Sequence, residues 1–240
     1  MSSRPRTVFI TGGSSGIGAA IARAFVSAGD YVTAIGATDS EVLAARDRAD
    51  MAGIVLEQLD VRDADAVSNR VSELGELDVV VNCAGVIRRG AEHSPDVFAD
   101  VIDINLNGTM RVCAAAREGL KARRGCIVNI ASMLSFFGGG LVPAYSASKG
   151  GVVQLTKSLA IAYATDGIRV NAVAPGWIST PLTQALQDDP ARSTQILART
   201  PLGRWGTPEE IAGPVMFLAS PAARFMTGVV LPVDGGYLIS

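Results

Sequence analysis

The sequence predicts an α/β fold, a single doubly wound domain in which a parallel sheet of about seven strands carries helices on both faces. Two observations lead to this prediction. Short apolar runs alternate with segments of helical spacing along the whole chain. The runs are almost uninterrupted by polar residues, which is typical of strands buried on both faces. Crossovers between such strands are right-handed, and ligands bind at the carboxyl ends of the strands.

The first elements surround a glycine-rich turn. Residues 7–10 form a β-branched and aromatic run that predicts a buried strand, and the turn follows it directly. Residues 19–28 have helical spacing, with Gly29 as a plausible C-cap. Residues 31–35 predict the second strand.

The next helix is expected over residues 40–49, with Asp39 and Ser40 as candidate caps. Residues 54–59 then predict the third strand, which ends at Asp60, and residues 64–74 the following helix. Asp60 is also a candidate N-cap for that helix.

The same alternation continues to the end of the chain. The remaining strands are predicted at residues 78–81, 126–130, 169–173 and 229–233, and the remaining helices at 97–119 and 146–164. Residues 175–208 are expected to be irregular, and a long irregular segment is often a lid or a substrate loop. One domain is therefore predicted over residues 1–240, with a substrate loop region at about 175–208.

Composition excludes several classes of function. The chain has 240 residues, a formal net charge of −2 and no run of like charge, which argues against a nucleic-acid binder and against an anionic membrane surface. No apolar stretch approaches the roughly 20 residues of a membrane span, and no signal peptide opens the sequence. A small molecule is the expected partner.

Cysteine and histidine usage points to the cytoplasm and away from metal. Cys83, Cys113 and Cys126 lack CxxC spacing, which fits a reducing compartment. His93 is the one histidine of the chain, so a site built from several imidazoles is excluded, and we expect no bound metal. We expect His93 to lie in a surface loop without a role.

The turn TGGSSGIG after the first strand predicts a nucleotide site. Its glycines permit a tight turn, a close approach of backbone to a pyrophosphate and close packing of helix on strand. The helix start offers free N–H groups and partial positive charge to phosphates. The predicted cofactor-binding residues here are Gly12, Ser14, Ser15, Gly16, Ile17 and Gly18. An ordinary turn is the alternative, which the flanking strand and helix disfavour.

Two further strand ends belong to the same predicted site. Asp60, followed by Val61, could accept a hydrogen bond from an adenine amino group at the end of the third strand. Asn82, Ala84 and Gly85 end the fourth strand with mostly small residues, which leaves room for a ribose. A plain turn is the alternative for this second segment.

Three residues predict proton transfer at a hydroxyl or carbonyl group. Tyr145 and Lys149 are four residues apart and therefore lie on one face of a helix. A free phenol has a pKa of about 10, and bringing it to about 7 requires roughly 4 kcal/mol, for which an adjacent ammonium and an oxidised nicotinamide have the right charge. Ser132 ends the fifth strand, where it can hydrogen-bond the substrate oxygen. With the nucleotide site, these residues indicate a dinucleotide-dependent oxidoreductase.

Together these residues resemble a known family over essentially the whole chain. The sequence is similar to the short-chain dehydrogenases/reductases. The matching segments are TGGSSGIG, NCAG, INLNG around Asn105, Ser132 with YSASK, PGWIST and the late VDGG. Cys83 departs from the family pattern, in which a second asparagine is usual at that position.

The resemblance implies a Rossmann fold and a role for each matching residue. Tyr145 would be the general acid/base, Lys149 would lower its pKa and bind the nicotinamide ribose, Ser132 would polarise the substrate, and Asn105 would hold a water of a proton relay. Residues that would line the nicotinamide are Pro175, Gly176, Ile178 and Thr180. The implied reaction is direct hydride transfer between nicotinamide and a secondary alcohol or ketone, without a metal.

Within the family, several segments resemble bacterial sugar-acid dehydrogenases. The segments GVIRRG, SMLSFFGG, VPAYSASK, LGRWGTPEE and LPVDGGYL are similar to those of the 2-deoxy-D-gluconate 3-dehydrogenase and gluconate 5-dehydrogenase group. The resemblance therefore implies a sugar acid or a polyol as substrate. The substrate-facing candidates are Arg88, Arg89, Met133, Leu134, Phe136, Phe137 and Trp177. An arginine at the mouth could clamp a carboxylate, and the alternative is that Arg88 and Arg89 are solvated loop charges.

The preferred cofactor is NAD, and NADP is not excluded. An acidic residue at the end of the second strand normally binds the ribose diol of NAD, and an arginine there the 2′-phosphate of NADP. This position holds Gly36-Ala37-Thr38, without a cation, and Asp39 is a possible acceptor for the diol.

Two alternatives and an oligomeric state complete the predictions. A 3-oxoacyl-carrier-protein reductase would need NADPH and a basic docking surface, whereas a non-catalytic dinucleotide-binding regulator would not need the intact Tyr145 and Lys149. The family resemblance implies a homotetramer that assembles through the helices after the fourth and fifth strands and through the last strand. Ala114, Ala115 and Ala116 would allow close helix contact there.

Overall fold

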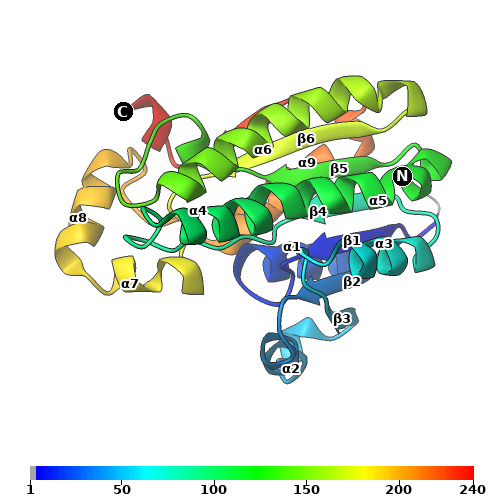
Figure 1. Ribbon diagram of the computed structural model, residues 1–240, viewed down its shortest axis with the longest axis horizontal. Helices are drawn as coiled ribbons and strands as arrows, with labels where there is room; N and C mark the ends of the chain where they lie inside the picture. The colour runs from blue at the N-terminus through cyan, green and yellow to red at the C-terminus, as the bar shows by residue number, and fades with distance from the viewer. Residues whose placement is uncertain (1–3) are drawn as a thin grey trace.

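The computed structural model describes residues 4–240 and has one parallel sheet between two layers of helices (Figure 1). The sheet order is β3-β2-β1-β4-β5-β6-β7, and every neighbouring pair is parallel. The strands are β1 (Thr7–Thr11), β2 (Tyr31–Gly36), β3 (Ile54–Gln58), β4 (Val79–Asn82), β5 (Cys126–Ile130), β6 (Arg169–Pro175) and β7 (Val230–Val233). The predicted doubly wound α/β fold is confirmed.

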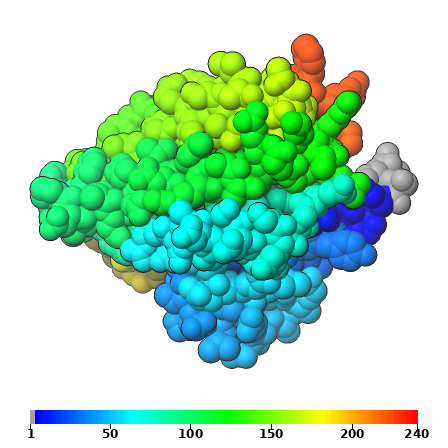
Figure 2. Space-filling view, turned by 45° about the vertical axis from the view of Figure 1, so that its right-hand side comes forward, coloured from blue at the N-terminus to red at the C-terminus, as the bar shows by residue number. Residues whose placement is uncertain are grey.

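Nine α-helices connect these strands within residues 4–240. They are α1 (Gly16–Ser27), α2 (Asp39–Arg46), α3 (Ala64–Glu73), α4 (Pro95–Ile102), α5 (Gly108–Arg123), α6 (Pro143–Ala162), α7 (Gln184–Gln187), α8 (Pro190–Arg199) and α9 (Pro208–Leu218). The face of the molecule in Figure 2 carries α4, α5 and α6, coloured green to yellow-green.

Each face of the sheet has its own hydrophobic core. Successive residues of a strand point to opposite faces, so Val8 and Ile10 pack toward α1, α2 and α9, while Phe9 between them packs toward α3, α5 and α6. The strands are therefore buried on both sides, which is why their sequences are continuously apolar.

The strand order fixes where a ligand can bind. The chain builds β1, β2 and β3 outward in one direction and then returns to place β4 on the other side of β1. Between β1 and β4 the helices leave toward opposite faces, and the crevice at the carboxyl ends of these strands is the usual ligand site of such sheets.

The prediction of one continuous helix over residues 97–119 is wrong, because the segment is longer and is interrupted. It begins earlier, at Pro95, is interrupted by a π-helical segment, Asp103–Asn107, and continues as α5 to Arg123. Pro95 at the first helical position accounts for the earlier start. The π segment contains Asn105, and such segments are frequent at functional sites.

Residues 175–208 are not irregular throughout, because α7 and α8 form within them. Pro190 occupies the first turn of α8, and the Asp189 side chain accepts hydrogen bonds from the backbone N–H groups of Ala191 and Arg192 at 3.1 Å each. The pair Asp189-Pro190 is a helix start signal that the sequence analysis overlooked. Both helices lie at the left of Figure 1.

Two predicted helix caps are replaced by neighbouring residues. Thr38, instead of Asp39 or Ser40, caps α2 by accepting from Glu41 N, and Asp63, instead of Asp60, caps α3 by accepting from Ala66 N.

Among residues 4–240, no helix combines the length and the apolar character that a membrane crossing needs.

Candidate active site

A cavity of about 640 Å³ opens along the carboxyl ends of the strands. Its volume is within the range of small-molecule and cofactor sites. The glycine-rich turn lies along one part of it, and Ser132, Tyr145 and Lys149 along another. The sheet thus brings Gly12 and Lys149, which are 137 residues apart in sequence, to the same cavity.

The turn between β1 and α1 requires glycine at specific positions. Gly12 has a φ of +64°, and a Cβ there would lie 2.7 Å from the Cα of Ala84. A Cβ on Gly18 would lie 2.1 Å from the backbone oxygen of Gly12. Ser15 is the N-cap of α1, but its side chain makes no capping hydrogen bond. The start of α1 therefore presents backbone N–H groups to the cavity, as a phosphate site requires.

A carboxylate in the first turn of α2, shortly after the end of β2, lines the cavity and was not predicted. Glu41, in the first turn of α2, lines the cavity, and its Oε2 accepts a hydrogen bond of 3.1 Å from the backbone N–H of Ala37. Asp39, the acceptor expected from the sequence, is exposed and does not line this cavity. Helical spacing could have found Glu41, because it lies three residues after the N-cap Thr38.

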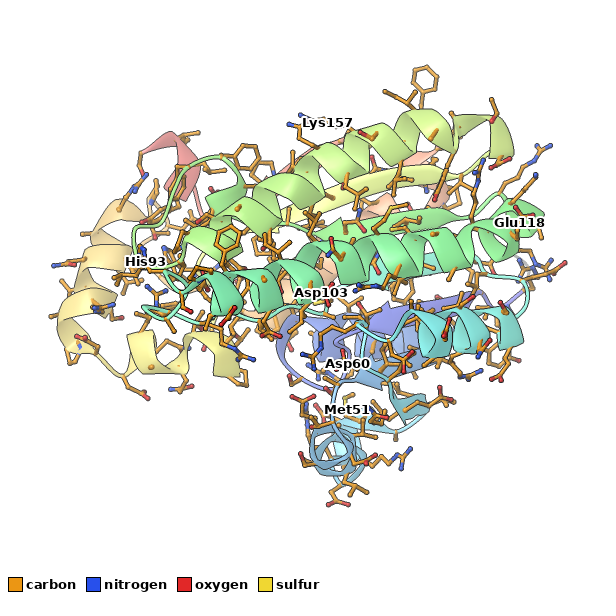
Figure 3. The ribbon with its side chains drawn as sticks, in the orientation of Figure 1. Met51, Asp60, His93, Asp103, Glu118 and Lys157 are labelled. Atoms are coloured by element: carbon orange, nitrogen blue, oxygen red, sulfur yellow. The ribbon has the colours of Figure 1, made fainter. Side chains whose placement is uncertain are left out.

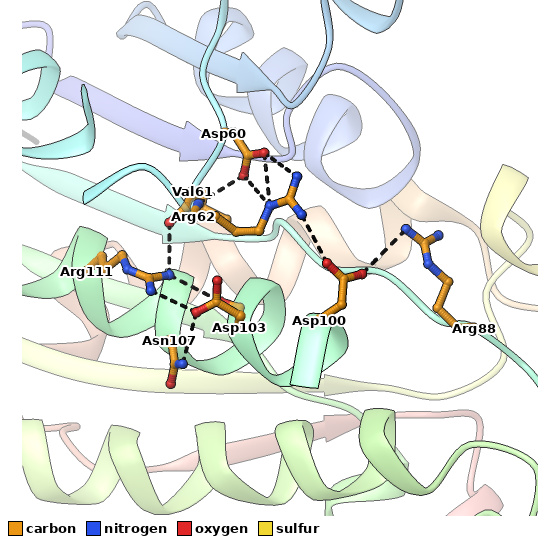
Figure 4. Close-up of polar contacts among 8 residues, drawn as sticks. All are labelled: Asp60, Val61, Arg62, Arg88, Asp100, Asp103, Asn107 and Arg111. Carbon is orange, nitrogen blue, oxygen red and sulfur yellow. Dashed lines mark hydrogen bonds and ion pairs between the residues drawn. The ribbon is translucent and has the colours of Figure 1, made fainter. Parts of the chain in front are cut away.

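Asp60 lines the cavity, but its carboxylate is engaged within the protein (Figure 4). Arg62 donates from Nη2 to Asp60 Oδ2 at 2.6 Å and from Nε to both carboxylate oxygens at 3.0 and 3.1 Å. This hydrogen bonding lowers the pKa of Asp60 despite its partial burial. Arg62 also donates to Asp100 Oδ1 at 3.0 Å, and Asp100 Oδ2 lies 4.0 Å from Nη2 of Arg88. A chain of opposite charges therefore runs along the cavity edge.

Tyr145 and Lys149 lie one helical turn apart in α6 and meet at the cavity. Lys149 is buried, its Nζ lies 5.7 Å from the centroid of the Tyr145 ring, and it donates a hydrogen bond of 2.7 Å to the carbonyl of Ile130. Ser132 lies two residues after the end of β5, and its Oγ accepts from Leu134 N at 3.1 Å. Its side chain also hydrogen-bonds that of Tyr145 at the cavity.

The polypeptide alone shifts the phenol pKa in the direction opposite to the sequence-based expectation. Burial raises the pKa of Tyr145 to about 12, and a hydrogen bond with Ser132 opposes this change only in part. Burial also lowers the pKa of Lys149 to about 8. Both shifts favour the neutral forms, as expected for ionisable groups removed from water.

Asn105 is fully buried behind the tyrosine and the lysine. Its side chain pairs with the backbone of Val86, accepting from N at 2.8 Å and donating to O at 3.0 Å, and it donates to Ser148 Oγ at 3.1 Å. A Cβ on Gly85 would lie 3.4 Å from Asn105 Oδ1 and 3.5 Å from Lys149 Nζ. The absence of a side chain at Gly85 thus leaves the space that both groups border.

Most of the predicted cofactor and catalytic residues meet at this cavity. Its lining includes Gly12, Ser14, Ser15, Gly16, Ile17, Gly18, Asp60, Val61, Ala84, Gly85, Ser132, Tyr145, Lys149, Pro175, Gly176, Ile178 and Thr180. The lining residues that were not predicted include Glu41, Arg62, Val86 and Leu182. Except for Glu41, no capping pattern marks them.

Asn82 does not line the cavity, and its side chain ties the sheet to α5. Its Nδ2 donates to Asn129 Oδ1 at 2.9 Å and to Cys113 Sγ at 3.2 Å. Asn129 in turn donates to Thr156 Oγ1 of α6 at 2.9 Å. This buried polar chain fixes the end of β4, from which Cys83 continues into the cavity wall.

The substrate candidates separate into two groups. Arg88 lines the cavity, whereas Met133 is buried and Leu134 partly buried beside Ser132, outside the lining. Trp177 borders a smaller neighbouring cavity and packs edge to face with Trp205, with ring centroids 5.8 Å apart.

The remaining candidates lie around the same region. Phe137 stacks with Tyr237 at 6.0 Å, and Phe136 is half exposed. Arg89 has a lowered pKa, because it is partly buried and repelled by Arg192 of α8.

Comparisons with known proteins agree with this arrangement. A family model described as enoyl-(acyl carrier protein) reductase matches residues 12–238. The 2-dehydro-3-deoxy-D-gluconate 5-dehydrogenase of Bacillus subtilis is 42% identical over 241 residues, which cover 97% of this chain and 94% of that protein. The 3-oxoacyl-(acyl-carrier-protein) reductase of Chlamydia muridarum is 40% identical, with 96% of each chain covered.

A solved structure is similar in fold over nearly the full length. The gluconate 5-dehydrogenase from Burkholderia cenocepacia, in complex with NADP and tartrate, superimposes with a TM-score of 0.90 at 35% identity. The match covers 98% of this chain and 96% of that one.

Proposed function

This chain belongs to the short-chain dehydrogenase/reductase family, and on that basis we propose that it transfers a hydride between a nicotinamide dinucleotide and a secondary hydroxyl or ketone of a sugar acid. One observation carries the proposal: the glycine-rich turn and the group Ser132, Tyr145 and Lys149 line the same cavity. A phosphate-binding turn alone would suit many nucleotide ligands, but a buried phenol and ammonium beside it suit an alcohol or a ketone.

The residues of the chain fit the cofactor. Gly12, Gly16 and the start of α1 would hold the pyrophosphate, and Lys149 with the small residues after β4 would hold the nicotinamide ribose. When bound, the nicotinamide accepts or supplies the hydride and, in its oxidised form, adds a positive charge near Tyr145.

Side chains of the protein would transfer the proton and bind the substrate oxygen. Ser132 hydrogen-bonds Tyr145 at the cavity, and it would donate its O–H to the oxygen of a bound substrate. The Tyr145 hydroxyl would take the proton of the carbinol during oxidation and return it during reduction. Lys149, fixed by Ile130, would keep a positive charge close to the phenol and stabilise its ionised form. Asn105 would support the proton path behind Lys149.

We propose NAD as the preferred cofactor, as the sequence analysis also concluded, but for a different reason. The carboxylate of Glu41 at the end of β2 suits a ribose diol and repels a 2′-phosphate. The nearby cation, Arg62, is already paired with Asp60 and Asp100. The NADP in the related Burkholderia structure is the argument against this preference.

Sugar acids are the proposed substrate class. The B. subtilis relative acts on 2-dehydro-3-deoxy-D-gluconate or its product by name, and the Burkholderia relative on gluconate. Arg88 at the cavity edge and Arg89 beside Arg192 supply guanidinium groups for a carboxylate. Residues 175–208, with α7 and α8, would form the cover over the substrate.

The test is turnover by the purified protein with a panel of polyols and sugar acids, followed by the absorbance of the reduced nicotinamide. The panel includes D-gluconate and 2-dehydro-3-deoxy-D-gluconate, each with NAD and with NADP and in both directions. We expect turnover of a sugar acid and its loss in Tyr145→Phe. Tyr163→Phe is the matched control, because Tyr163 is a buried tyrosine at the far end of α6. Unchanged turnover in a folded Tyr145→Phe protein would refute the proposal.

A 3-oxoacyl-carrier-protein reductase is the second candidate. The 40% identity to the C. muridarum enzyme over 96% of the chain favours it. Reduction of a 3-oxoacyl thioester by NADPH at a higher kcat/KM than that of any sugar acid would identify this activity instead.

We also propose a cytoplasmic homotetramer. Exposed apolar side chains lie on the surfaces that the family resemblance assigns to assembly: Phe98 on α4, Met110 on α5, Ile161 on α6 and Phe225 before β7. Light scattering should give four times the 24.8 kDa of one chain. The monomer mass would contradict this proposal.

A further inference from the structure

A buried carboxylate joins Tyr145 to the loop formed by residues 88–93. Glu92 lies in the loop between β4 and α4 and is only 1% exposed. Its Oε1 accepts a hydrogen bond from Arg88 N, and its Oε2 accepts one from Tyr145 N, each at 2.8 Å. Neither the glycine-rich turn nor the proton-transfer group explains a fully buried acidic residue at this position.

The start of α6 depends on this side chain. Val142 is the N-cap and has no polar side chain, and Pro143 at the first helical position has no N–H group. The N–H of Tyr145 belongs to the first turn, where backbone donors lack partners within the helix. Glu92 provides that partner from 53 residues earlier in the chain. Its charge is also favourable at the positive end of the α6 dipole.

Two more contacts hold the same loop against the same segment. Gly90 N donates to Leu141 O at 2.8 Å, and Nε2 of His93 lies 2.9 Å from Gly140 O. Figure 3 shows His93 at the same end of the molecule as the start of α6. The loop from Arg88 to His93 is therefore fastened along residues 140–145. Of these contacts, the hydrogen bond that Glu92 accepts is the one that reaches Tyr145.

Several titratable and charged groups surround Tyr145 and Glu92. Burial is the main reason for the raised pKa of Tyr145, the hydrogen bond with Ser132 lowers it, and negative charge on Cys83 or Glu92 raises it further. Burial also raises the pKa of Cys83 to about 11, so this thiol is uncharged near neutral pH. Lys149 faces the phenol ring from the same helix. Arg89 is the cation that interacts with Glu92.

We propose that Glu92 is a positioning residue, which holds Tyr145 in register with Ser132 and couples its place to the backbone at Arg88, in the loop between β4 and α4. This inference rests on the proposed function, because it requires Tyr145 to exchange the substrate proton. Glu92 touches neither substrate nor cofactor and acts through the two N–H groups it accepts from.

The first test is the pH profile of Glu92→Gln and Glu92→Asp with the sugar acid that the wild type oxidises. Glutamine keeps the size but removes the charge, and its amide nitrogen faces one of the two N–H donors. We expect kcat to fall by about 10-fold to 100-fold, with KM for the cofactor unchanged. We also expect the midpoint of the oxidation profile to move to lower pH, because a negative charge that disfavours phenolate is gone.

Glu92→Asp separates position from charge. Aspartate keeps the charge but is one methylene too short to reach both N–H groups, so kcat should fall while the midpoint of the profile stays. Asp63→Asn is the matched control, since Asp63 caps α3 away from the cavity. It should lower thermal stability and leave both kcat and the profile unchanged.

A second readout does not depend on turnover. Hydrogen exchange at the backbone amides of Arg88 and Tyr145 should be at least about 10-fold faster in Glu92→Gln than in wild type. Amides in the centre of α9 serve as the internal reference and should not change.

The outcomes separate this inference from the proposed function. Full turnover in Tyr145→Phe would refute the proposed function. If Tyr145→Phe is inactive while folded Glu92→Gln keeps the wild-type kcat, pH midpoint and amide exchange, then only the role of Glu92 is overturned. If Glu92→Gln does not fold, kcat and amide exchange are measured on Glu92→Asp instead. Wild-type values of both would overturn the proposed role of Glu92.

Discussion

Nζ of Lys149 donates a hydrogen bond of 2.7 Å to the backbone carbonyl of Ile130, the last residue of β5. A side chain of α6 is thereby fastened to the sheet edge at which the cavity opens. The lysine is held by the backbone of the fold and is not free to follow a ligand. Its position beside Tyr145 is consequently set before any substrate arrives.

Replacing this lysine should remove turnover without unfolding the chain. In Lys149→Met the apolar length of the side chain is kept, and the buried charge is lost. We expect kcat to fall at least about 100-fold, with a melting temperature equal to or above that of the wild type, because a desolvated ammonium is costly to bury. Lys157→Met is the control, since Lys157 is exposed on the same helix (Figure 3). Equal kcat in the two variants would contradict the assigned role.

The direction of the pKa shifts predicts the pH dependence of ketone reduction. Reduction needs the protonated phenol and the charged ammonium. The pKa of Tyr145 is raised to about 12 and that of Lys149 is lowered to about 8, so the lysine loses its proton first as pH rises. We expect kcat/KM for reduction to be level below about pH 7 and to fall through about pH 8. A profile that stays level to about pH 10 would show that Lys149 keeps its charge.

Cofactor preference should depend on Glu41. Glu41→Gln keeps an acceptor for the Ala37 N–H and removes the negative charge. We expect the ratio of kcat/KM for NADP over NAD to rise about 10-fold. Asp39→Asn is the control, because Asp39 lies two residues before Glu41 in α2 and does not line the cavity. If Asp39→Asn changes the ratio and Glu41→Gln does not, the acceptor expected from the sequence is the correct one.

Two glycine substitutions should affect different properties: Gly18→Ala should weaken cofactor binding, and Gly213→Ala should stabilise the fold. A Cβ on Gly18 would lie 2.1 Å from Gly12 O, so Gly18→Ala must displace the turn, and we expect NADH to bind at least about 10-fold more weakly. Gly213 is exposed within α9 with no atom near its Cβ position, so Gly213→Ala should stabilise the fold by about 0.5–1 kcal/mol. Fluorescence titration with NADH and urea unfolding measure the two effects. Unchanged NADH binding in Gly18→Ala would remove the turn from the cofactor site.

Arg89 should contribute to binding of a carboxylate. It is partly buried and repelled by Arg192, and the charge of Glu92 attracts it without forming an ion pair within residues 4–240, so a bound carboxylate would relieve the remaining repulsion. Arg89→Ala should raise KM for a sugar acid about 10-fold or more and leave KM for the neutral polyol nearly unchanged. Arg88→Ala should have a smaller effect, because Asp100 lies 4.0 Å from its guanidinium. Equal increases for the acid and the polyol would exclude a carboxylate clamp.

The sequence predicted the framework of the site because that framework is encoded locally. Uninterrupted apolar runs mark strands buried on both faces, and TGGSSGIG marks a strand-to-helix turn that only glycine can make. The spacing of Tyr145 and Lys149 places both on one helical face. In each case the signal lies within one element, and the structure agrees on where the turn lies and which side chains share the cavity.

The partners of individual side chains could not be read in this way. Asp60 is engaged by Arg62, two residues later in the chain, and Glu41 lines the cavity where Asp39 was expected. The acceptor for Tyr145 N–H, Glu92, comes from another loop 53 residues away. The sequence by itself determined the sheet, the turn and the proton-transfer group, since backbone sterics and hydrophobic periodicity act over a few residues. Only the tertiary structure decided the charge partners around them, because a buried carboxylate is placed by the packing of elements that are remote in the chain.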